Sequence, residues 1–237
     1  MVETGVKACA VIVAAGTGSR LGGDAKQFRQ LGDRPLLAWS CALFASHPEV
    51  EHLIVVLPRG LAESPPGWLE RFHPTVVTGG ATRRESVGRG LAAVGDSDFV
   101  LIHDAARPFV SADLVSRLLG AVSSRGPVIP VLEVSDAIKQ IDAPAAGASV
   151  KQTLDRSILR VAQTPQAFPF EQIRRLHELA EVSGQECPDD AMLCEAAGIE
   201  VQTIPGERWA FKVTQVEDLA LAEWLVSSGR VRPADGT

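Results

Sequence analysis

The sequence predicts an α/β fold: a Rossmann-like, mostly parallel β-sheet flanked by helices, with a β-hairpin arm projecting from it. Three observations predict this fold class. Short runs rich in valine and isoleucine recur along the chain, amphipathic helical segments separate them, and one stretch past the middle interrupts the alternation. Apolar runs of this kind are typical of strands that are covered on both faces by helices.

Five apolar runs are the candidate strands of the central sheet. In chain order they are CAVIVAA (9–15), HLIVVLP (52–58), PTVVTGG (74–80), DFVLIHDA (98–105) and GPVIPVLE (126–133). Their β-branched side chains pack well in strands and lose rotamer freedom in helices. We therefore expect these runs to form the buried centre of the fold.

Helical spacing of apolar residues predicts the covering helices. The segments are 35–47, 83–95, 112–124, 170–182, 189–198 and 214–228, each with an apolar stripe and a polar back. In the last segment, Thr214 and Glu217 form a T-x-x-E pattern, which predicts a capping box at the helix start. We expect this helix to close the domain.

Residues 134–156 depart from the alternation of strands and helices. Two short alternating stretches flank the turn-like DAPAAGA, which predicts a hairpin arm. Because an isolated hairpin is marginally stable in water, we expect the arm to pack on a second copy of the chain in a homodimer. No repeat or linker divides the sequence, so residues 1–237 are expected to form a single domain that includes this dimerisation arm.

Composition excludes several classes of function. The formal net charge of −6 and a pI near 5.4 argue against a nucleic-acid-binding protein. No window approaches the roughly 20 apolar residues of a membrane span. The four cysteines show neither zinc-ligand spacing nor a disulfide framework, which favours the reducing cytoplasm.

The stretch AVIVAAGTGSRLGGDAKQF (10–28) is the first candidate site. A strand leads into a glycine-rich turn whose exposed N–H groups suit phosphate oxygens, and Arg20 and Lys26 add two positive charges. An ordinary glycine-rich turn explains an isolated G-x-G equally well. A dinucleotide fingerprint fails because Leu21 stands where a glycine is required, and a Walker loop fails because no GK[ST] follows.

Beyond this loop, motifs in a fixed order run through nearly the whole chain. They are AAGTGSR…KQF, GGATRRESV (79–87), HDAARP (103–108), SDAIK (135–139), DR and TPQAF within 155–168, DDA (189–191), FKVT (211–214) and EDLALAE (217–223). This series resembles the 2-C-methyl-D-erythritol 4-phosphate cytidylyltransferase family, and it implies a fold of the nucleotide-diphospho-sugar transferase type. HDAARP and TPQAF are the most specific of these motifs.

The resemblance implies that the phosphate of methylerythritol phosphate attacks the α-phosphorus of CTP and releases pyrophosphate, in the non-mevalonate isoprenoid pathway. Because both reactants are anions, positioned cations and Mg²⁺ supply most of the catalysis. By resemblance, the catalytic cations are Arg20, Lys26 and Lys212, which surround the triphosphate.

The same resemblance assigns residues to each substrate. Those implied to bind the nucleotide are Ala14, Ala15, Gly16, Gly18, Gly80, Ala81 and Ser86. Those implied to bind the hydroxyls or phosphate of the acceptor are Asp104, Arg107, Asp136 and Arg156, with Arg156 reaching the site of the neighbouring subunit. Asp104 is also the candidate metal ligand, although most of the metal's ligands would come from the CTP phosphates. His103 is expected to be a packed strand residue, given its apolar neighbours.

Two departures from the family pattern lie near the acceptor pocket. Ala137 and Pro188 stand where many members have threonines, so two candidate hydroxyl contacts are missing. A cytidylyltransferase for another polyol phosphate, such as ribitol 5-phosphate, is therefore the nearest alternative. A nicotinamide-dependent oxidoreductase is disfavoured by Leu21, and a non-catalytic CTP-binding regulator is disfavoured by the presence of all three catalytic cations.

Overall fold

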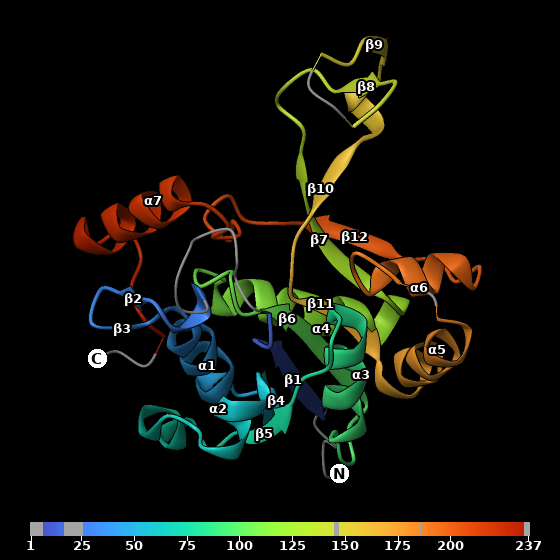
Figure 1. Ribbon diagram of the computed structural model, residues 1–237. Helices are drawn as coiled ribbons and strands as arrows, with labels where there is room; N and C mark the ends of the chain where they lie inside the picture. Colours follow the sequence, from blue (N-terminus) through green and yellow to red (C-terminus); the bar gives the residue numbers. More distant parts are fainter. Residues whose placement is uncertain (1–6, 17–25, 145–146, 185, 235–237) are drawn as a thin grey trace.

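The computed structural model describes residues 7–16, 26–144, 147–184 and 186–234. Its centre is an eight-stranded sheet in the order β10-β7-β11-β6-β1-β4-β5, with β12 also paired to β7. The strands are β1 (Ala8–Val13), β4 (Val50–Leu57), β5 (Thr75–Thr78), β6 (Phe99–Asp104), β7 (Val128–Glu133), β10 (Arg160–Ala162), β11 (Gln166–Pro169) and β12 (Gln202–Pro205). The predicted α/β architecture is confirmed (Figure 1).

The sheet is mixed rather than uniformly parallel. β1 pairs in parallel with β4 and β6, β4 with β5, and β7 with β12. β11 runs antiparallel to both β6 and β7, and β10 runs antiparallel to β7. The five predicted strands are therefore present, while the three short strands that complete the sheet come from segments with no long apolar run.

Helices cover both faces of the sheet (Figure 1). The helices are α1 (Leu36–Ser46), α2 (Arg59–Glu63), α3 (Arg83–Ala92), α4 (Ala112–Arg125), α5 (Phe170–Ser183), α6 (Ala191–Ala196) and α7 (Val216–Ser227). The short 3₁₀ turns are η2 (Lys26–Phe28), η3 (Gly67–Phe72) and η4 (Arg156–Ile158), and β2 (Gln30–Leu31) pairs with β3 (Arg34–Pro35). None of the described helices is long and apolar enough to span a membrane.

Strand β1 explains why the central runs are continuously apolar. Ala8, Ala10 and Ile12 belong to the core cluster shared with α1 and α4, whereas Cys9 and Val11 face the cluster shared with α3 and α5. Successive side chains of a strand point to opposite faces, so a strand covered on both sides needs apolar residues at every position.

Helix α7 begins one residue later than the T-x-x-E pattern predicts. Gln215 is the N-cap and Asp218 the third helical residue of the capping box, so the predicted pair of Thr214 and Glu217 is wrong. The cause is Asp218, whose carboxylate accepts hydrogen bonds from the backbone N–H of Thr214 and Gln215 and from the Thr214 hydroxyl. That hydroxyl is thus a donor to Asp218.

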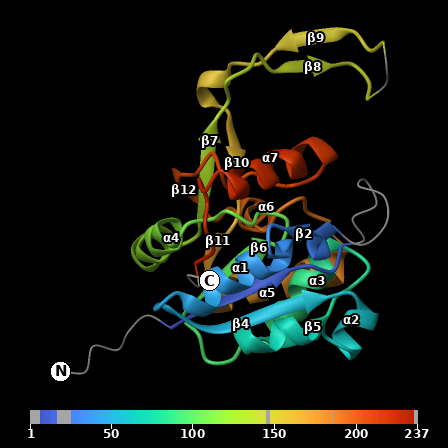
Figure 2. The same ribbon diagram turned by 90° about the vertical axis from the view of Figure 1, so that its left-hand side faces the viewer.

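The interrupting segment forms the predicted hairpin. β8 (Lys139–Ile141) pairs antiparallel with β9 (Val150–Thr153), and both strands are exposed. The hairpin stands on the paired strands β7 and β10 and projects away from the main sheet in both views (Figures 1 and 2). Its apolar side chains Ile141 and Val150 are 46% and 59% exposed.

Helix α3 approaches the sheet closely at Gly90 but not at Gly88. A Cβ at Gly90 would lie 2.6 Å from Val11 Cγ1 and 3.0 Å from Val56 Cγ2, whereas a Cβ at Gly88 meets nothing within 4 Å. We expect Gly90→Ala to lower the free energy of unfolding by about 1–3 kcal/mol through overpacking. Gly88→Ala, the matched control, should raise it by up to about 1 kcal/mol through helix propensity. Urea denaturation measures both, and equal effects would contradict this packing.

Candidate active site

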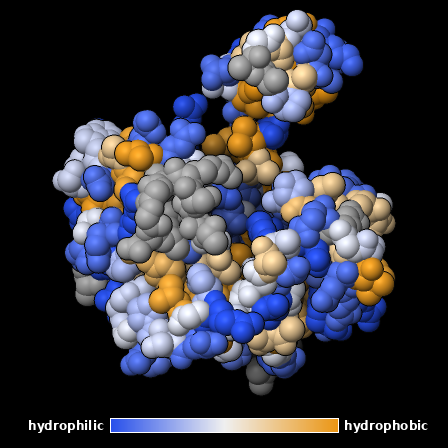
Figure 3. Space-filling view, in the orientation of Figure 1, coloured by the Kyte–Doolittle hydropathy of each residue, from blue (hydrophilic) through white to orange (hydrophobic). Residues whose placement is uncertain are grey.

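The candidate site lies where the carboxyl ends of β1, β4 and β6 meet. Ala14 follows β1 and donates its N–H to Val56 O of β4 at 2.9 Å, and Ala105, which follows β6, donates to Val13 O at 3.2 Å. Ligands of open α/β sheets gather at this edge, because loops leave the parallel strands on the same side. Figure 3 shows hydrophilic residues in the depression at the centre of this face, below the arm.

The first glycine-rich loop is held by a buried glutamine. Gln27 is 3% exposed, and its Nε2 donates to Ala14 O at 2.5 Å and to Gly16 O at 2.9 Å. The hydrogen bonds fix the carbonyls at the start of the loop and place the backbone of Lys26 beside it. Gly18 and Arg20 lie outside the described residues. Our sequence analysis missed Gln27, although its position within the KQF motif could have indicated it.

The second glycine-rich loop, at 79–82, contacts the first. A Cβ at Gly79 would lie 2.2 Å from Ala15 Cβ, so only glycine permits this approach. The Ser86 hydroxyl accepts a hydrogen bond from Gly80 N at 3.1 Å and donates to Thr82 O at 2.9 Å, while Glu85 accepts from Ala81 N at 2.8 Å. Four predicted nucleotide-binding residues, Ala14, Ala15, Gly80 and Ala81, thus lie in adjoining loops, and a fifth, Ser86, lies in the first turns of α3.

Asp104 joins two cations that are distant in the sequence. Its Oδ2 accepts from Lys212 Nζ at 2.6 Å, and its Oδ1 accepts from Arg83 Nε at 3.2 Å. Arg83, at the start of α3, also donates to Asp190 Oδ2 at 2.8 Å. The structure therefore brings together the HDAARP, FKVT, GGATRRESV and DDA motifs. Arg83 and Asp190 were not among the predicted site residues.

Charge pairing determines the ionisation of this cluster. Burial opposes ionisation of Asp104 and Asp190, but the charges of Arg83 and, for Asp104, of Lys212 outweigh it and lower both pKa values below the usual range. For Arg83, burial opposes the charge, yet Asp190 and Asp104 raise its pKa. Asp104, Asp190 and Arg83 are therefore charged at neutral pH.

The Asp190 carboxylate is fully buried and anchors the far end of the cluster. Its Oδ1 lies 3.1 Å from His177 Nε2, and its backbone N–H donates to Gln166 Oε1 at 3.1 Å. Gln166 also donates to Asp189 at 3.0 Å. These contacts connect Arg83, through Asp190, to α5 and β11. The guanidinium that contacts Asp104 is therefore also fixed by Asp190.

His103 is a packed strand residue, as predicted. It is fully buried, and its ring nitrogens lie 3.2 Å from Ser40 Oγ and 3.1 Å from Thr164 Oγ1. Burial lowers its pKa to about 4, so the ring is neutral at pH 7. Its contacts fix the end of β6 from which Asp104 projects.

The Arg107 guanidinium braces the segment that carries Lys212. It donates to Ala210 O at 2.9 Å and to Ala162 O at 3.4 Å, and Val213 N donates to Ala106 O at 2.8 Å. The two loops are thereby clamped together, which positions Lys212 beside Asp104. Among the described residues these carbonyls accept from the two terminal nitrogens of Arg107, while its buried Nε has no hydrogen-bond partner.

Asp136 and Arg156 lie at the base of the arm, apart from this cluster. Both are exposed, and the Arg156 guanidinium donates to Ser135 O, which places it next to Asp136. In Figures 1 and 2 the arm rises above the sheet and stands apart from the body of the chain. The structure thus separates these two predicted substrate-binding residues from the others within one chain.

Asp104 fits a minor role in holding a divalent cation. Both its oxygens already accept from cations, and the described residues contain no group of three or more potential metal-binding side chains. Mg²⁺ is commonly held by one or two carboxylates together with substrate phosphates and water. A metal here would therefore depend on phosphate oxygens for most of its ligands.

Comparison with known proteins shows consistent similarity. A model of the 2-C-methyl-D-erythritol 4-phosphate cytidylyltransferase family, IspD, matches residues 8–228. The cytidylyltransferase of Thermus thermophilus is 43% identical over 215 residues, covering 91% of this chain and 95% of that protein. The crystal structure of the Thermus thermophilus enzyme superimposes with a TM-score of 0.78 and 39% identity, over 92% of this chain and 98% of that one.

The chain is also similar to longer proteins. The bifunctional enzyme IspD/IspF of Rhodopseudomonas palustris strain HaA2 is 41% identical over 241 residues. The match covers 97% of this chain but only 58% of that relative. The chain thus spans less than two thirds of the length of the bifunctional relatives it matches.

The buried Asp190 gives a test of the cluster. We expect Asp190→Asn to lower the free energy of unfolding by about 3–5 kcal/mol, because Arg83 loses a buried counter-charge. Asp113→Asn, which removes an exposed pair with Arg117, should change it by less than about 1 kcal/mol. Chemical denaturation at pH 7 measures both, and a small loss for Asp190→Asn would contradict a tightly coupled cluster.

The same variant alters the dependence of stability on pH. Because folding lowers the pKa values of Asp104 and Asp190, their stabilisation is complete above the unfolded pKa of about 4 and is lost as the pH falls further. The free energy of unfolding of the unaltered protein should therefore fall below pH 4, and more steeply than that of Asp190→Asn.

Proposed function

The chain belongs to the 2-C-methyl-D-erythritol 4-phosphate cytidylyltransferase family, and we propose that it transfers CMP from CTP to 2-C-methyl-D-erythritol 4-phosphate. The products are 4-diphosphocytidyl-2-C-methyl-D-erythritol and pyrophosphate, formed in the non-mevalonate route to isoprenoids. The observation that carries the proposal is the contact between Lys212 and Asp104, 2.6 Å apart and 108 residues apart in sequence. It assembles two family motifs at one ligand-binding edge.

In the proposed mechanism an acceptor phosphate oxygen attacks the α-phosphorus of CTP, a new P–O bond forms, and the bond to the β-phosphate oxygen breaks. Arg20, Lys26 and Lys212 offset the repulsion between the two anions and the charge that grows on pyrophosphate. Because Lys212 is 40% exposed while paired to Asp104, its ammonium is able to reach a ligand at the surface. Bound Mg²⁺ would neutralise phosphate charge and orient the triphosphate.

Nucleotide recognition in this proposal uses the two touching loops. Ala15 and Gly16 end the first loop's described part, and Gly79, next to Gly80 and Ala81, approaches Ala15 closely. A Cβ added at Gly16 would meet nothing within 4 Å, so this position is open to a ligand. Ser86 holds Gly80 by its hydroxyl and retains a lone pair for a donor such as the cytosine amino group. Gly18 and Ala14 complete the proposed nucleotide-binding set.

The acceptor site is proposed to form between two copies of the chain. Arg156 and Asp136 stand on an arm that is set apart from the sheet of their own chain, which supports a role for them in the site of a partner subunit. The planar guanidinium of Arg156 suits the acceptor phosphate. We propose a homodimer of single-domain chains joined through residues 134–156, acting in the cytoplasm, where the four buried, free cysteines stay reduced.

Pyrophosphate release with CTP and Mg²⁺ tests the reaction. We expect strong preference for methylerythritol phosphate over ribitol 5-phosphate as acceptor. The reverse preference would support the alternative acceptor, which Ala137 and the exposed Pro188 favour because neither supplies a hydroxyl. Release with neither acceptor would refute both proposals.

Lysine substitutions test the catalytic cations. Lys26→Ala and Lys212→Met should each lower kcat by a factor on the order of 100 or more, because each removes a fixed charge beside the transferred phosphoryl group. Lys7→Ala is the control, since its pairing with the exposed Asp96 lies at the other end of β1. Steady-state kinetics and circular dichroism are the measurements. An unchanged kcat would remove that lysine from the mechanism.

A mixing experiment tests whether the site is shared. Arg156→Ala should mainly raise the KM for the acceptor and leave CTP binding nearly unchanged. At an acceptor concentration too low for Arg156→Ala alone to turn over, mixing Arg156→Ala and Lys212→Met chains should restore up to about a quarter of wild-type activity, because half of randomly formed dimers contain one intact site. No recovery after subunit exchange would show that each chain builds its own site.

A further inference from the structure

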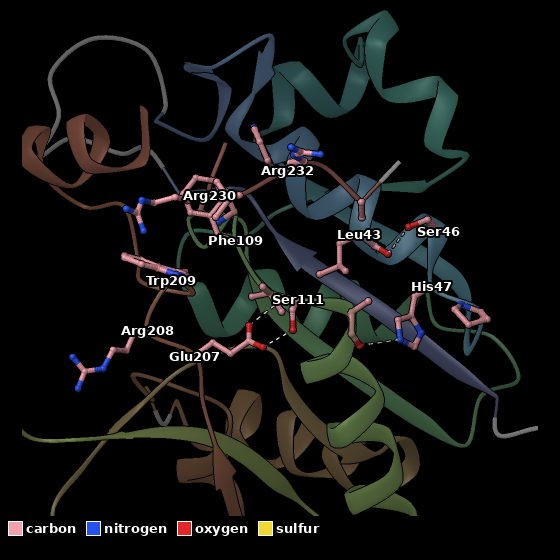
Figure 4. A pocket seen from close by; sticks show the side chains of 17 residues that line it. Leu43, Ser46, His47, Phe109, Ser111, Glu207, Arg208, Trp209, Arg230 and Arg232 are labelled. Carbon is pink, nitrogen blue, oxygen red and sulfur yellow. Dashed lines mark hydrogen bonds between the residues drawn. The ribbon is translucent and has the colours of Figure 1, made fainter. Parts of the chain in front are cut away.

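A cavity lies next to the segments that follow Asp104 and precede Lys212. It encloses about 830 Å³ between α1, the 108–112 segment, the 207–209 segment and residues 230–234 (Figure 4). Arg83, Asp104 and Lys212 are not among the described residues that line it. Small-molecule sites typically measure about 300–1,000 Å³. The cavity is thus of the right size for a ligand of its own and is separate from the ion-pair cluster.

Its walls are apolar and aromatic. Trp39 and Phe109 lie edge to face with ring centroids 5.3 Å apart, and Leu43 and Val110 line the same space. Trp209, which is 44% exposed, forms part of the wall on the Phe109 side, and Leu43 lies opposite in Figure 4. Aromatic walls with one solvent-exposed tryptophan suit a flat or apolar ligand group.

Positively charged side chains outnumber negatively charged ones in the lining of the cavity. Three arginines line it, Arg208, Arg230 and Arg232, against a single carboxylate, Glu207. Glu207 is already engaged, because it accepts from Ser111 N at 3.0 Å and from the Ser111 hydroxyl and lies 3.7 Å from Arg117. In the described part of the chain none of the three arginines forms a salt bridge with a carboxylate.

The three arginines are not equivalent. The Arg230 guanidinium lies 5.0 Å from the centroid of the Trp224 ring, and Arg208 points away from the other labelled side chains in Figure 4. Arg232 is exposed and lies at the rim opposite Glu207 and Ser111. Arg232 therefore supplies a positive charge at the rim of the cavity, and apolar side chains share the lining with polar ones such as Ser111 and His47.

From this arrangement we infer that the cavity binds a small amphipathic anion. An aromatic or aliphatic group enters between Trp209, Phe109 and Leu43, and a sulfonate, phosphate or carboxylate group stays at the rim beside Arg232. Such a ligand is complementary to the cavity in shape and in charge. Its apolar group is removed from water, while its anionic group stays solvated and lies next to a cation. This binding site is independent of the proposed transfer reaction.

The test uses 8-anilinonaphthalene-1-sulfonate as the anionic probe and N-phenyl-1-naphthylamine, which lacks the sulfonate, as the neutral one. With the unaltered protein we expect saturable binding of one anionic probe per chain, excited in part through tryptophan, because Trp39 and Trp209 line the cavity. The neutral probe should bind at least about fivefold more weakly, the scale of one favourable charge interaction at a surface. Equal affinities, or binding that does not saturate, would overturn the inference.

Substitutions then localise the probe. Arg232→Glu should weaken binding of the anionic probe by about fivefold or more, and Trp209→Ala by about tenfold, because they remove the rim charge and an aromatic wall. Arg175→Glu is the matched control, an equally exposed arginine on α5, on the other face of the sheet. Circular dichroism checks each fold. Equal losses for Arg232→Glu and Arg175→Glu would place the probe elsewhere and overturn the inference.

Discussion

The Asp104 carboxylate is the constraint on which the candidate site depends. The proposed site for two phosphorylated substrates must gather cations, and cations at short range repel one another. Asp104 accepts from Arg83 and Lys212 at the same time, so a single buried negative charge holds two positive ones at one edge of the sheet. The cost of burying this carboxylate is offset by both partners, which is why its pKa falls despite burial. Without it, neither the start of α3 nor the FKVT segment has an ion pair that holds it to β6.

The surrounding structure supports that carboxylate from several directions. His103 fixes the end of β6 through Ser40 and Thr164, and Arg107 clamps the backbone on either side of Lys212. Asp190 holds Arg83 from behind. These residues are mostly buried, and their partners are backbone groups or other buried side chains. The arrangement is thus an integral part of the fold, and it presents the ammonium of Lys212 to solvent while its counter-ions stay protected.

Much of the fold was predictable because it rests on local signals. The central strands are largely apolar, and α4 and α5 have clear apolar stripes, so these elements were found from sequence alone. The predicted stripe of α1 is wrong, because every residue from Leu36 to Phe44 is buried. The strands β11 and β12 were missed because each has four residues whose pairing is set by distant partners. The start of α7 was misplaced because Asp218 competes with Glu217 for the capping role. For the site, motif resemblance indicated Asp104 and Lys212. Arg83, Asp190 and Gln27 also lie within the motifs, but their roles follow from contacts between segments more than ten residues apart.

The position of β11 has a consequence for how the chain reaches its native state. β6 and β7 are consecutive central strands in the sequence, yet they are not neighbours in the sheet, since β11 lies between them. A nascent chain that ends before residue 166 has β1, β4, β5 and β6 ready to pair, while β7 has neither β11 nor β12 beside it. The sheet therefore consists of two parts, one around β1 and one around β7, and β11 joins them. β11 has four residues and is synthesised after the strands on either side of it. Loop closure of this kind slows folding, because the intervening chain loses conformational entropy before the strand pairing contributes any stabilising free energy.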